Sequence, residues 1–162
     1  MKIIDKIKNS IIISVQAMPN EPLYREECMN AMIQSVLMGG AKALRLAGAR
    51  DIKNAKRFSD VPIIGLTKPE VIPKNWKQIV YITPGMKEIS ELIAAGADII
   101  ATDGTSRPRG NDNVRKLIKY IAMHKKASMA DVSTLSEAVA ARALGFDIIS
   151  TTLSGYTQNS PA

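Results

Sequence analysis

The chain has 162 residues, of which 46% are hydrophobic and 23% charged, so it has enough apolar surface for one domain with a buried core and is too short for two large ones. A single cysteine excludes an internal disulfide framework and a cysteine-based zinc site, and no apolar run is long enough to span a membrane. The 22 Lys and Arg residues outnumber the 15 Asp and Glu residues, and the resulting net charge of +7 suits an anionic partner.

The chain begins with a short helical stretch at residues 3–7 and then alternates apolar runs with amphipathic stretches. The apolar runs predict buried strands at residues 11–15, 42–46, 61–66, 98–101, 127–130 and 147–150. The stretches between them predict helices at residues 29–37, 51–58, 89–93, 114–122 and 135–143. Glycines at 39–40, 96 and 145 mark helix ends, and Thr134 with Glu137 forms a capping box at a helix start.

Near-continuous apolar strands that alternate with helices predict an α/β fold with a parallel sheet covered by helices. The segment Gly96-Ala97-Asp98-Ile99-Ile100 returns in similar form as Gly145-Phe146-Asp147-Ile148-Ile149, and each copy joins a helix end to a strand start. Repeated units of this kind favour a (β/α)₈ barrel of the TIM type. A doubly wound sheet is the alternative, although no G-x-G-x-x-G follows the first strand.

Each predicted strand has a polar or charged residue at or just after its carboxyl end. In a (β/α) barrel the chemistry lies at these carboxyl ends of the strands. The residues found there are Gln16, Arg45, Lys68, Asp103, Asp131 and the pair Thr151-Thr152. If all of them point inwards, they form one ring of cations, carboxylates, an amide and hydroxyls around the mouth of the barrel.

Each member of this ring also has a purely structural interpretation. Arg45 and Asp131 would form a buried ion pair, because charges buried at a rim are usually paired. Lys68 precedes a proline in a loop and would be solvated surface, and Asp103 would cap the turn that starts at Gly104. Outside the ring, His124 and Cys28 are expected to be a solvated side chain and an idle thiol.

The positive charge does not by itself indicate nucleic-acid binding. The Lys and Arg residues are scattered, only Arg107-Pro108-Arg109 is locally dense, and no platform of aromatic and basic residues is present. A phosphorylated small molecule is therefore the expected partner, without nucleic acid or membrane. Residues 1–10 alternate Ile with Lys and Asp, unlike a secretory signal, so a cytoplasmic location is expected. The sequence leaves open whether the chain forms a homo-oligomer.

Several stretches match one known family in unbroken order from about residue 10 to residue 160. They are Ser14-Val15-Gln16-Ala17, Gly39-Gly40-Ala41, Arg45, Pro62-Ile63-Ile64-Gly65 with Lys68, Tyr81-Ile82-Thr83-Pro84, Asp103 with Thr105 and Arg107-Pro108, Met129-Ala130-Asp131-Val132-Ser133-Thr134, and Thr151-Thr152-Leu153-Ser154-Gly155-Tyr156-Thr157. In these stretches the chain resembles the bacterial N-acetylmannosamine-6-phosphate 2-epimerase family, whose members act in sialic-acid breakdown.

The resemblance implies an epimerase that interconverts the 6-phosphates of N-acetylmannosamine and N-acetylglucosamine by removing and returning the C2 proton, without a metal or a nucleotide cofactor. Lys68 aligns with the family's lysine and would be one of two acid–base groups. Gln16, Arg45 and Asp131 align with substrate-positioning residues, and Thr152 is assigned to substrate binding with them. Asp103 and Arg107 are further candidates for the site.

The sequence also departs from the family pattern. Residues 69–76 differ from the usual Arg-Asp-Tyr continuation after the lysine, and Ala47 stands where the family commonly has Asn. Six strands are predicted, whereas a closed barrel has eight and typically about 250 residues. In the family the seventh strand ends in Ala-Glu-Gly, whose Glu is the second acid–base residue, and the eighth strand and its loop bind the phosphate. Residues 158–162 resemble neither.

The expectation is therefore a single (β/α)-barrel domain over residues 1–162 that lacks the last two βα units and is inactive in isolation. Two further hypotheses stay open at this point. One is a non-catalytic barrel remnant that at most binds a phosphosugar or a partner chain. The other is a different phosphosugar enzyme with the same barrel.

Overall fold

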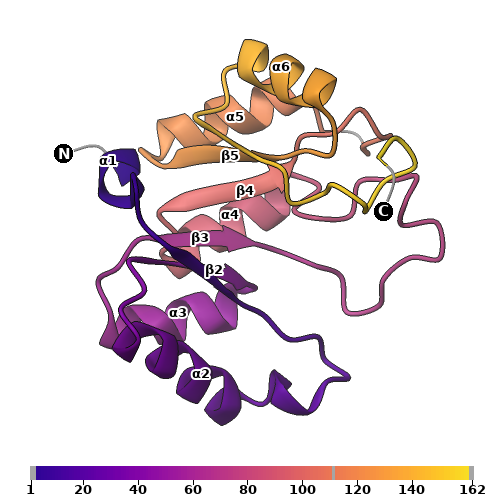
Figure 1. The fold of residues 1–162 in the computed structure, drawn as a ribbon. Helices are drawn as coiled ribbons and strands as arrows, with labels where there is room; N and C mark the ends of the chain where they lie inside the picture. Colours follow the sequence, from indigo (N-terminus) through magenta and orange to yellow (C-terminus); the bar gives the residue numbers. More distant parts are fainter. Residues whose placement is uncertain (1–2, 111, 161–162) are drawn as a thin grey trace.

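The computed structural model describes residues 3–110 and 112–160 (Figure 1). Its six strands form one parallel sheet in the order β1 to β6, so each strand lies beside the next strand in the chain. A doubly wound sheet would reverse its strand order at a switch point, and this sheet does not. The (β/α)-barrel prediction is thus confirmed, with six of its units present in the chain.

The helices and strands agree with the sequence pattern to within a few residues at each end. The strands are β1 (Ile12–Val15), β2 (Ala43–Ala47), β3 (Ile63–Leu66), β4 (Ile99–Asp103), β5 (Ala127–Asp131) and β6 (Ile148–Ser150). The helices are α1 (Ile3–Ile7), α2 (Glu26–Met38), α3 (Ala49–Phe58), α4 (Met86–Ala95), α5 (Val114–Met123) and α6 (Leu135–Leu144), with a 3₁₀ turn η1 (Pro22–Tyr24) before α2. None of these helices is long and apolar enough to cross a membrane.

The sheet is curled, with helices α2 to α6 on its outer side (Figure 1). The curl is evident from Arg45 on β2, whose guanidinium lies 2.7 Å from the carboxylate of Asp131 on β5. In a flat sheet, strands three positions apart would be separated by about 14 Å. The carboxyl ends of β2 and β5 therefore face each other across a concave surface.

Side chains alternate between the two faces of the sheet, as the period of two requires. On the outer face, a cluster that includes Leu44, Leu46 and Ile63 packs against Met29 and Ile33 of α2 and against α3, α4 and α5. On the inner face, Ile64, Leu66, Ile99, Ala101 and Met129 form a second cluster, against which the three isoleucines of α1 pack. By the same alternation, a residue two positions after an inner-face apolar residue, such as Asp131 after Met129 on β5, lies on the inner face towards the mouth of the curl.

The internal repeat has a structural role. The carboxylate of Asp98 accepts the backbone N–H of Ile63 at the start of β3, at 2.9 Å, and Asp147 accepts the N–H of Ser128 on β5, at 2.8 Å. Gly96 and Gly145, with φ of 98° and 102°, end α4 and α6 just before these aspartates, in a left-handed conformation that favours glycine. The repeat therefore ties β4 to β3 and β6 to β5 at the starts of these strands.

Candidate active site

A cavity of about 240 Å³ lies at the carboxyl ends of the strands, inside the curl. Its lining combines four of the predicted site residues with a set of apolar and aromatic side chains. The lining residues are Ser14, Gln16, Arg45, Lys68, Tyr81, Ile82, Thr152, Leu153 and Tyr156. A larger hollow of about 740 Å³ between β1 and α2 has Glu21 as its one charged lining residue. The smaller cavity is therefore the candidate active site.

Arg45 lines this cavity, and Asp131 lies buried beneath it, so the two form a charged floor of which only Arg45 reaches the cavity. Nη2 of Arg45 donates to Oδ2 of Asp131 at 2.7 Å, and Nη1 contacts the sulfur of Met129 at 3.6 Å. The hydroxyl of Thr152 donates to the other carboxylate oxygen of Asp131, also at 2.7 Å. Asp131 is fully buried and its acceptors are shared by these two groups, whereas Arg45 stays partly exposed to the cavity.

Lys68 follows β3 by two residues and reaches the mouth of the same cavity. Its side chain is accessible to solvent. Even so, the protein atoms around the ammonium lower its pKa, and the positive charge of Arg45 lowers it further, while Glu21 and Asp131 act in the opposite direction. A lowered pKa increases the share of neutral amine near pH 7, which is the form that can accept a proton.

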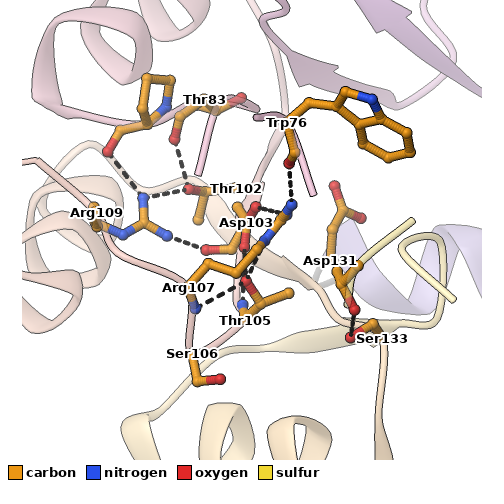
Figure 2. A network of polar contacts seen from close by, with 12 residues as sticks. Trp76, Thr83, Thr102, Asp103, Thr105, Ser106, Arg107, Arg109, Asp131 and Ser133 are labelled. Atoms are coloured by element: carbon orange, nitrogen blue, oxygen red, sulfur yellow. Dashed lines mark hydrogen bonds and ion pairs between the residues drawn. The ribbon is translucent and has the colours of Figure 1, made fainter. Parts of the chain in front are cut away.

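Asp103 and Arg107 are not in the cavity lining but form a buried network behind it (Figure 2). Asp103 pairs with Arg107, and its other oxygen accepts the N–H and the hydroxyl of Thr105, at 2.9 and 2.7 Å. Arg107 also donates to Thr105 Oγ1 at 3.0 Å and to the carbonyl oxygen of Trp76 at 2.8 Å. The turn-capping interpretation of Asp103 matches these contacts, and the Arg107 side chain donates to protein oxygens from all three of its nitrogens.

Comparison with known proteins adds a second, independent observation. A sequence model of the family described as "Putative N-acetylmannosamine-6-phosphate epimerase" matches residues 29–162. Two curated relatives carry the name "Putative N-acetylmannosamine-6-phosphate 2-epimerase". The one from Clostridioides difficile is 41% identical over 95% of this chain and 68% of its own length, and the one from Mycoplasma mycoides is 43% identical over 98% of this chain and 70% of its own length. This chain belongs to the N-acetylmannosamine-6-phosphate 2-epimerase family.

Solved structures agree with this assignment to the epimerase family. The 2-epimerase from Clostridium perfringens superposes with a TM-score of 0.90 at 40% sequence identity, over 99% of this chain and 69% of that one. The 2-keto-3-deoxy-6-phosphogluconate aldolase from Zymomonas mobilis superposes with a TM-score of 0.64 at 12% identity, which shows a shared fold only. These matches favour the epimerase over the hypothesis of a non-catalytic remnant.

Sequence reasoning missed the apolar half of the epimerase cavity. Tyr81, Ile82, Leu153 and Tyr156 line it, although the first two follow no predicted strand. Burial raises the pKa of the Tyr81 phenol, with nearby Arg107 opposing that effect, so the phenol stays protonated at neutral pH and can donate a hydrogen bond. The available signal was that all four residues lie in stretches of the family resemblance, Tyr81-Ile82-Thr83-Pro84 and Thr151-Thr152-Leu153-Ser154-Gly155-Tyr156-Thr157.

Proposed function

We propose that this chain acts as an N-acetylmannosamine-6-phosphate 2-epimerase and that Lys68 is one of its two acid–base groups. The observation that supports this most directly is the placement of Lys68, with a lowered pKa, beside the Arg45–Asp131 pair in one cavity. The reaction would interconvert the 6-phosphates of N-acetylmannosamine and N-acetylglucosamine, as the names of the relatives indicate.

The chemistry needs a base that accepts the C2 proton and, beside it, a group that stabilises the oxyanion; an amine and a cation at adjacent positions fit these two roles. In the open-chain aldehyde form, the C2 hydrogen is acidic because the electrons of the C–H bond can move into a C1–C2 double bond and place negative charge on the aldehyde oxygen. Neutral Lys68 would accept this proton. Arg45 has N–H groups beyond those that it gives to Asp131 and Met129, and these would donate to the developing oxyanion.

The remaining candidates would hold the sugar. Gln16 and Thr152 present an amide and a hydroxyl to the cavity, and both suit hydrogen bonds to sugar hydroxyls. Asp131 would act mainly by fixing Arg45 and Thr152, because its two oxygens already accept from them. We propose a small phosphosugar as the partner of the site, and no nucleic acid or membrane surface. With such a substrate, we also propose a cytoplasmic location.

Inversion at C2 requires a second acid–base group on the opposite face of the enolate, and no second carboxylate or amine is placed for that role among the described residues of the cavity. We infer that the six units are the first six of a barrel that two further βα units close, and that these units bring the second group and the phosphate site. The 68–70% share of the relatives' length that the chain matches supports this inference.

The test follows C2 proton exchange separately from inversion. The chain is incubated in D₂O with each of the two 6-phosphates in turn, and deuterium at C2 and epimer formation are both followed by NMR. We expect slow exchange with retention in the epimer whose C2 hydrogen faces Lys68, its loss in Lys68→Arg, and wild-type behaviour in Lys87→Arg, which changes an exposed lysine on α4. An arginine side chain keeps its proton and cannot act as the base.

Two outcomes would contradict the proposal. Wild-type exchange in Lys68→Arg would remove this lysine from the mechanism. Rapid epimerisation by residues 1–162 alone would overturn the requirement for two further units. A fusion of residues 1–162 to the part of the C. perfringens enzyme beyond the matched region is the positive arm, and it should epimerise only with Lys68 intact.

A further inference from the structure

The sheet opens between β3 and β4 at the end that carries the cavity. These two strands are in register at only two positions, Ile64 with Ile99 and Gly65 with Ile100. In contrast, β4 and β5 stay in register over five positions, from Ile99 to Asp103. Beyond the last pair of β3 and β4, residues 81–84 occupy the gap, and we call this segment the wedge.

The wedge replaces the missing strand contacts with main-chain hydrogen bonds of its own. The carbonyl oxygen of Ile82 accepts the N–H of Asp103 on β4, at 3.3 Å. The N–H of Thr83 donates to the carbonyl oxygen of Thr67, directly after β3, at 3.1 Å. Ile82 and Thr83 are both buried, so these contacts lie inside the protein and not at its surface.

Thr83 holds the centre of the wedge in a conformation that is rare for its residue type. Its φ is +42°, and the other described non-glycine residues with positive φ, Asn9 and Lys125, are both exposed. Such a backbone is unfavourable for a β-branched residue and persists only where the surroundings hold it. Here Oγ1 of Thr83 accepts the N–H of Thr67 at 2.9 Å, and its carbonyl oxygen accepts the hydroxyl of Thr102 at 2.7 Å.

The Arg107-Pro108-Arg109 motif binds the wedge and the residues beside it (Figure 2). Arg109 donates to the carbonyl oxygen of Pro84 at 2.9 Å, to Thr102 Oγ1 at 3.3 Å and to the carbonyl oxygen of Asp103. The carbonyl oxygen of Pro108 accepts the N–H of Val80, just before the wedge, at 3.1 Å. The densest cationic motif of the sequence thus binds main-chain and side-chain oxygens of its own chain.

These contacts converge on the residue next to the proposed base. Thr83 binds both the N–H and the carbonyl oxygen of Thr67. Lys68 is the residue directly after Thr67. Tyr81 and Ile82 of the wedge line the same cavity as Lys68. We propose that Thr83, held in its strained conformation by Thr102 and Arg109, is a positioning residue that sets Lys68 and Tyr81 around the substrate. This inference rests on the proposed function of Lys68.

The environment of Lys68 offers a readout that a loss of stability alone would not change. The protein atoms around the ammonium are the largest influence on its pKa, followed by Arg45, with Glu21 and Asp131 opposing them. If the Thr67 main chain is released, Lys68 moves away from the protein atoms and the Arg45 charge that lower its pKa. Its titration midpoint should then rise towards the ordinary value of a lysine side chain.

The experiment compares Thr83→Val with Thr83→Ser in the full chain of residues 1–162. Lysine side chains carry ¹³C, Lys68 is assigned with the Lys68→Arg variant, and the midpoint of each lysine is followed by NMR. We expect an upward shift for Lys68 and faster exchange of the Thr67 amide in Thr83→Val. Both should stay at wild-type values in Thr83→Ser, which keeps the accepting oxygen.

A control variant and a second route keep this test decisive. Thr134→Val removes the helix cap of α6, far from Lys68 in the sequence, so it should lower the melting temperature and leave the Lys68 midpoint unchanged.

If Thr83→Val does not fold, Arg109→Met removes the hydrogen bond to the carbonyl oxygen of Pro84 in the wedge and should give the same shift. An unchanged midpoint in a folded Thr83→Val or Arg109→Met variant would overturn the inference. A shifted midpoint together with normal C2 exchange in Lys68→Arg would instead refute the proposed function and leave the positioning role intact.

Discussion

Two arginine–aspartate pairs stand at the carboxyl ends of the strands, and they differ in how many of their groups the protein itself uses. Arg107 donates from Nε, Nη1 and Nη2, to Thr105, Trp76 and Asp103. Arg45 donates from Nη2 to Asp131 and from Nη1 to a sulfur, a weak acceptor, and its Nε has no partner among the described residues. The side chain of Arg107 is 4% exposed and that of Arg45 is 12% exposed, on the cavity side.

This difference separates a structural pair from a binding pair that has the same composition. A buried charge whose nitrogens all donate within the protein is expected to stabilise the fold, whereas unused donors at a cavity can bind a ligand. The Arg107–Asp103 pair joins residues four apart, and the Arg45–Asp131 pair joins residues 86 apart across the curl. The predictions below test whether the two pairs divide stability and binding in this way.

The largest effect is expected from Asp103→Asn. This change leaves the Arg107 guanidinium buried without its counter-charge, and such losses cost about 3–5 kcal/mol of unfolding free energy. Asp131→Asn should cost clearly less, because Arg45 can turn its charge towards the cavity water. Urea unfolding of both variants measures the difference. Equal losses would show that the two pairs are structurally equivalent.

Arg45→Gln should show the opposite balance. We expect N-acetylglucosamine 6-phosphate to bind more than tenfold more weakly, because hydrogen bonds to charged groups contribute about 1.5–3 kcal/mol. Affinity is measured by chemical-shift titration. Arg107→Gln is the matched variant, and in it stability should fall far more than affinity does. A weaker ligand effect in Arg45→Gln than in Arg107→Gln would reverse the assignment of the two pairs.

Glu137 extends the comparison to a buried carboxylate without a cation. Burial alone would raise its pKa, but hydrogen bonds from Ser133, Ser106 and Thr134 outweigh burial and lower it. Because the folded-state pKa is lowered, its contribution to stability is complete above the unfolded value of about 4.3 and is lost as the pH falls through the folded value. Glu137→Gln should cost about 1.5 kcal/mol at pH 7 and flatten the acid side of the stability profile, measured by urea unfolding between pH 3 and 7. An unchanged profile would show that other carboxylates govern the acid transition.

The smallest effect is expected from Thr152→Val. Its hydroxyl gives Asp131 one hydrogen bond at the exposed edge of the cavity, so the loss should be near the low end of the usual range, about 0.5 kcal/mol. Thermal unfolding measures this loss. A cost as large as that of Asp103→Asn would mean that the Asp131 pair depends on Thr152 for its stability.

The fold could be predicted from the sequence because each βα unit carries its own signals. Each apolar run, each helix-ending glycine and the Thr134–Glu137 capping box is local to a single βα unit. The structure confirms the order of strands and helices that these signals predict. The prediction that Gln16, Arg45, Lys68 and Thr152 lie near one another agrees with their shared cavity, since residues at parallel strand ends meet at one edge. Their roles in binding and catalysis stay predictions.

The wedge and the Arg107 network could not be predicted for a physical reason. Residues 67–85 contain no regular element, so no periodicity shows which of their side chains turn inwards. Asp103 and Asp131 both stand at the end of an apolar strand, and Asp103 differs in the Gly104 that follows it and in Arg107 four residues later. The direction in which Arg107 points depends on the Trp76 carbonyl, whose place follows from the tertiary fold alone.

The order of the strands in the sheet has a consequence for how the protein is made. Because every strand pairs with the one synthesised just before it, the growing chain can add one βα unit at a time to a sheet that already exists. The Arg45–Asp131 contact is of a different kind, because Arg45 meets Asp131 only after 86 further residues have been synthesised. The scaffold is therefore laid down progressively during synthesis, and the charged floor of the cavity is completed only when β5 arrives.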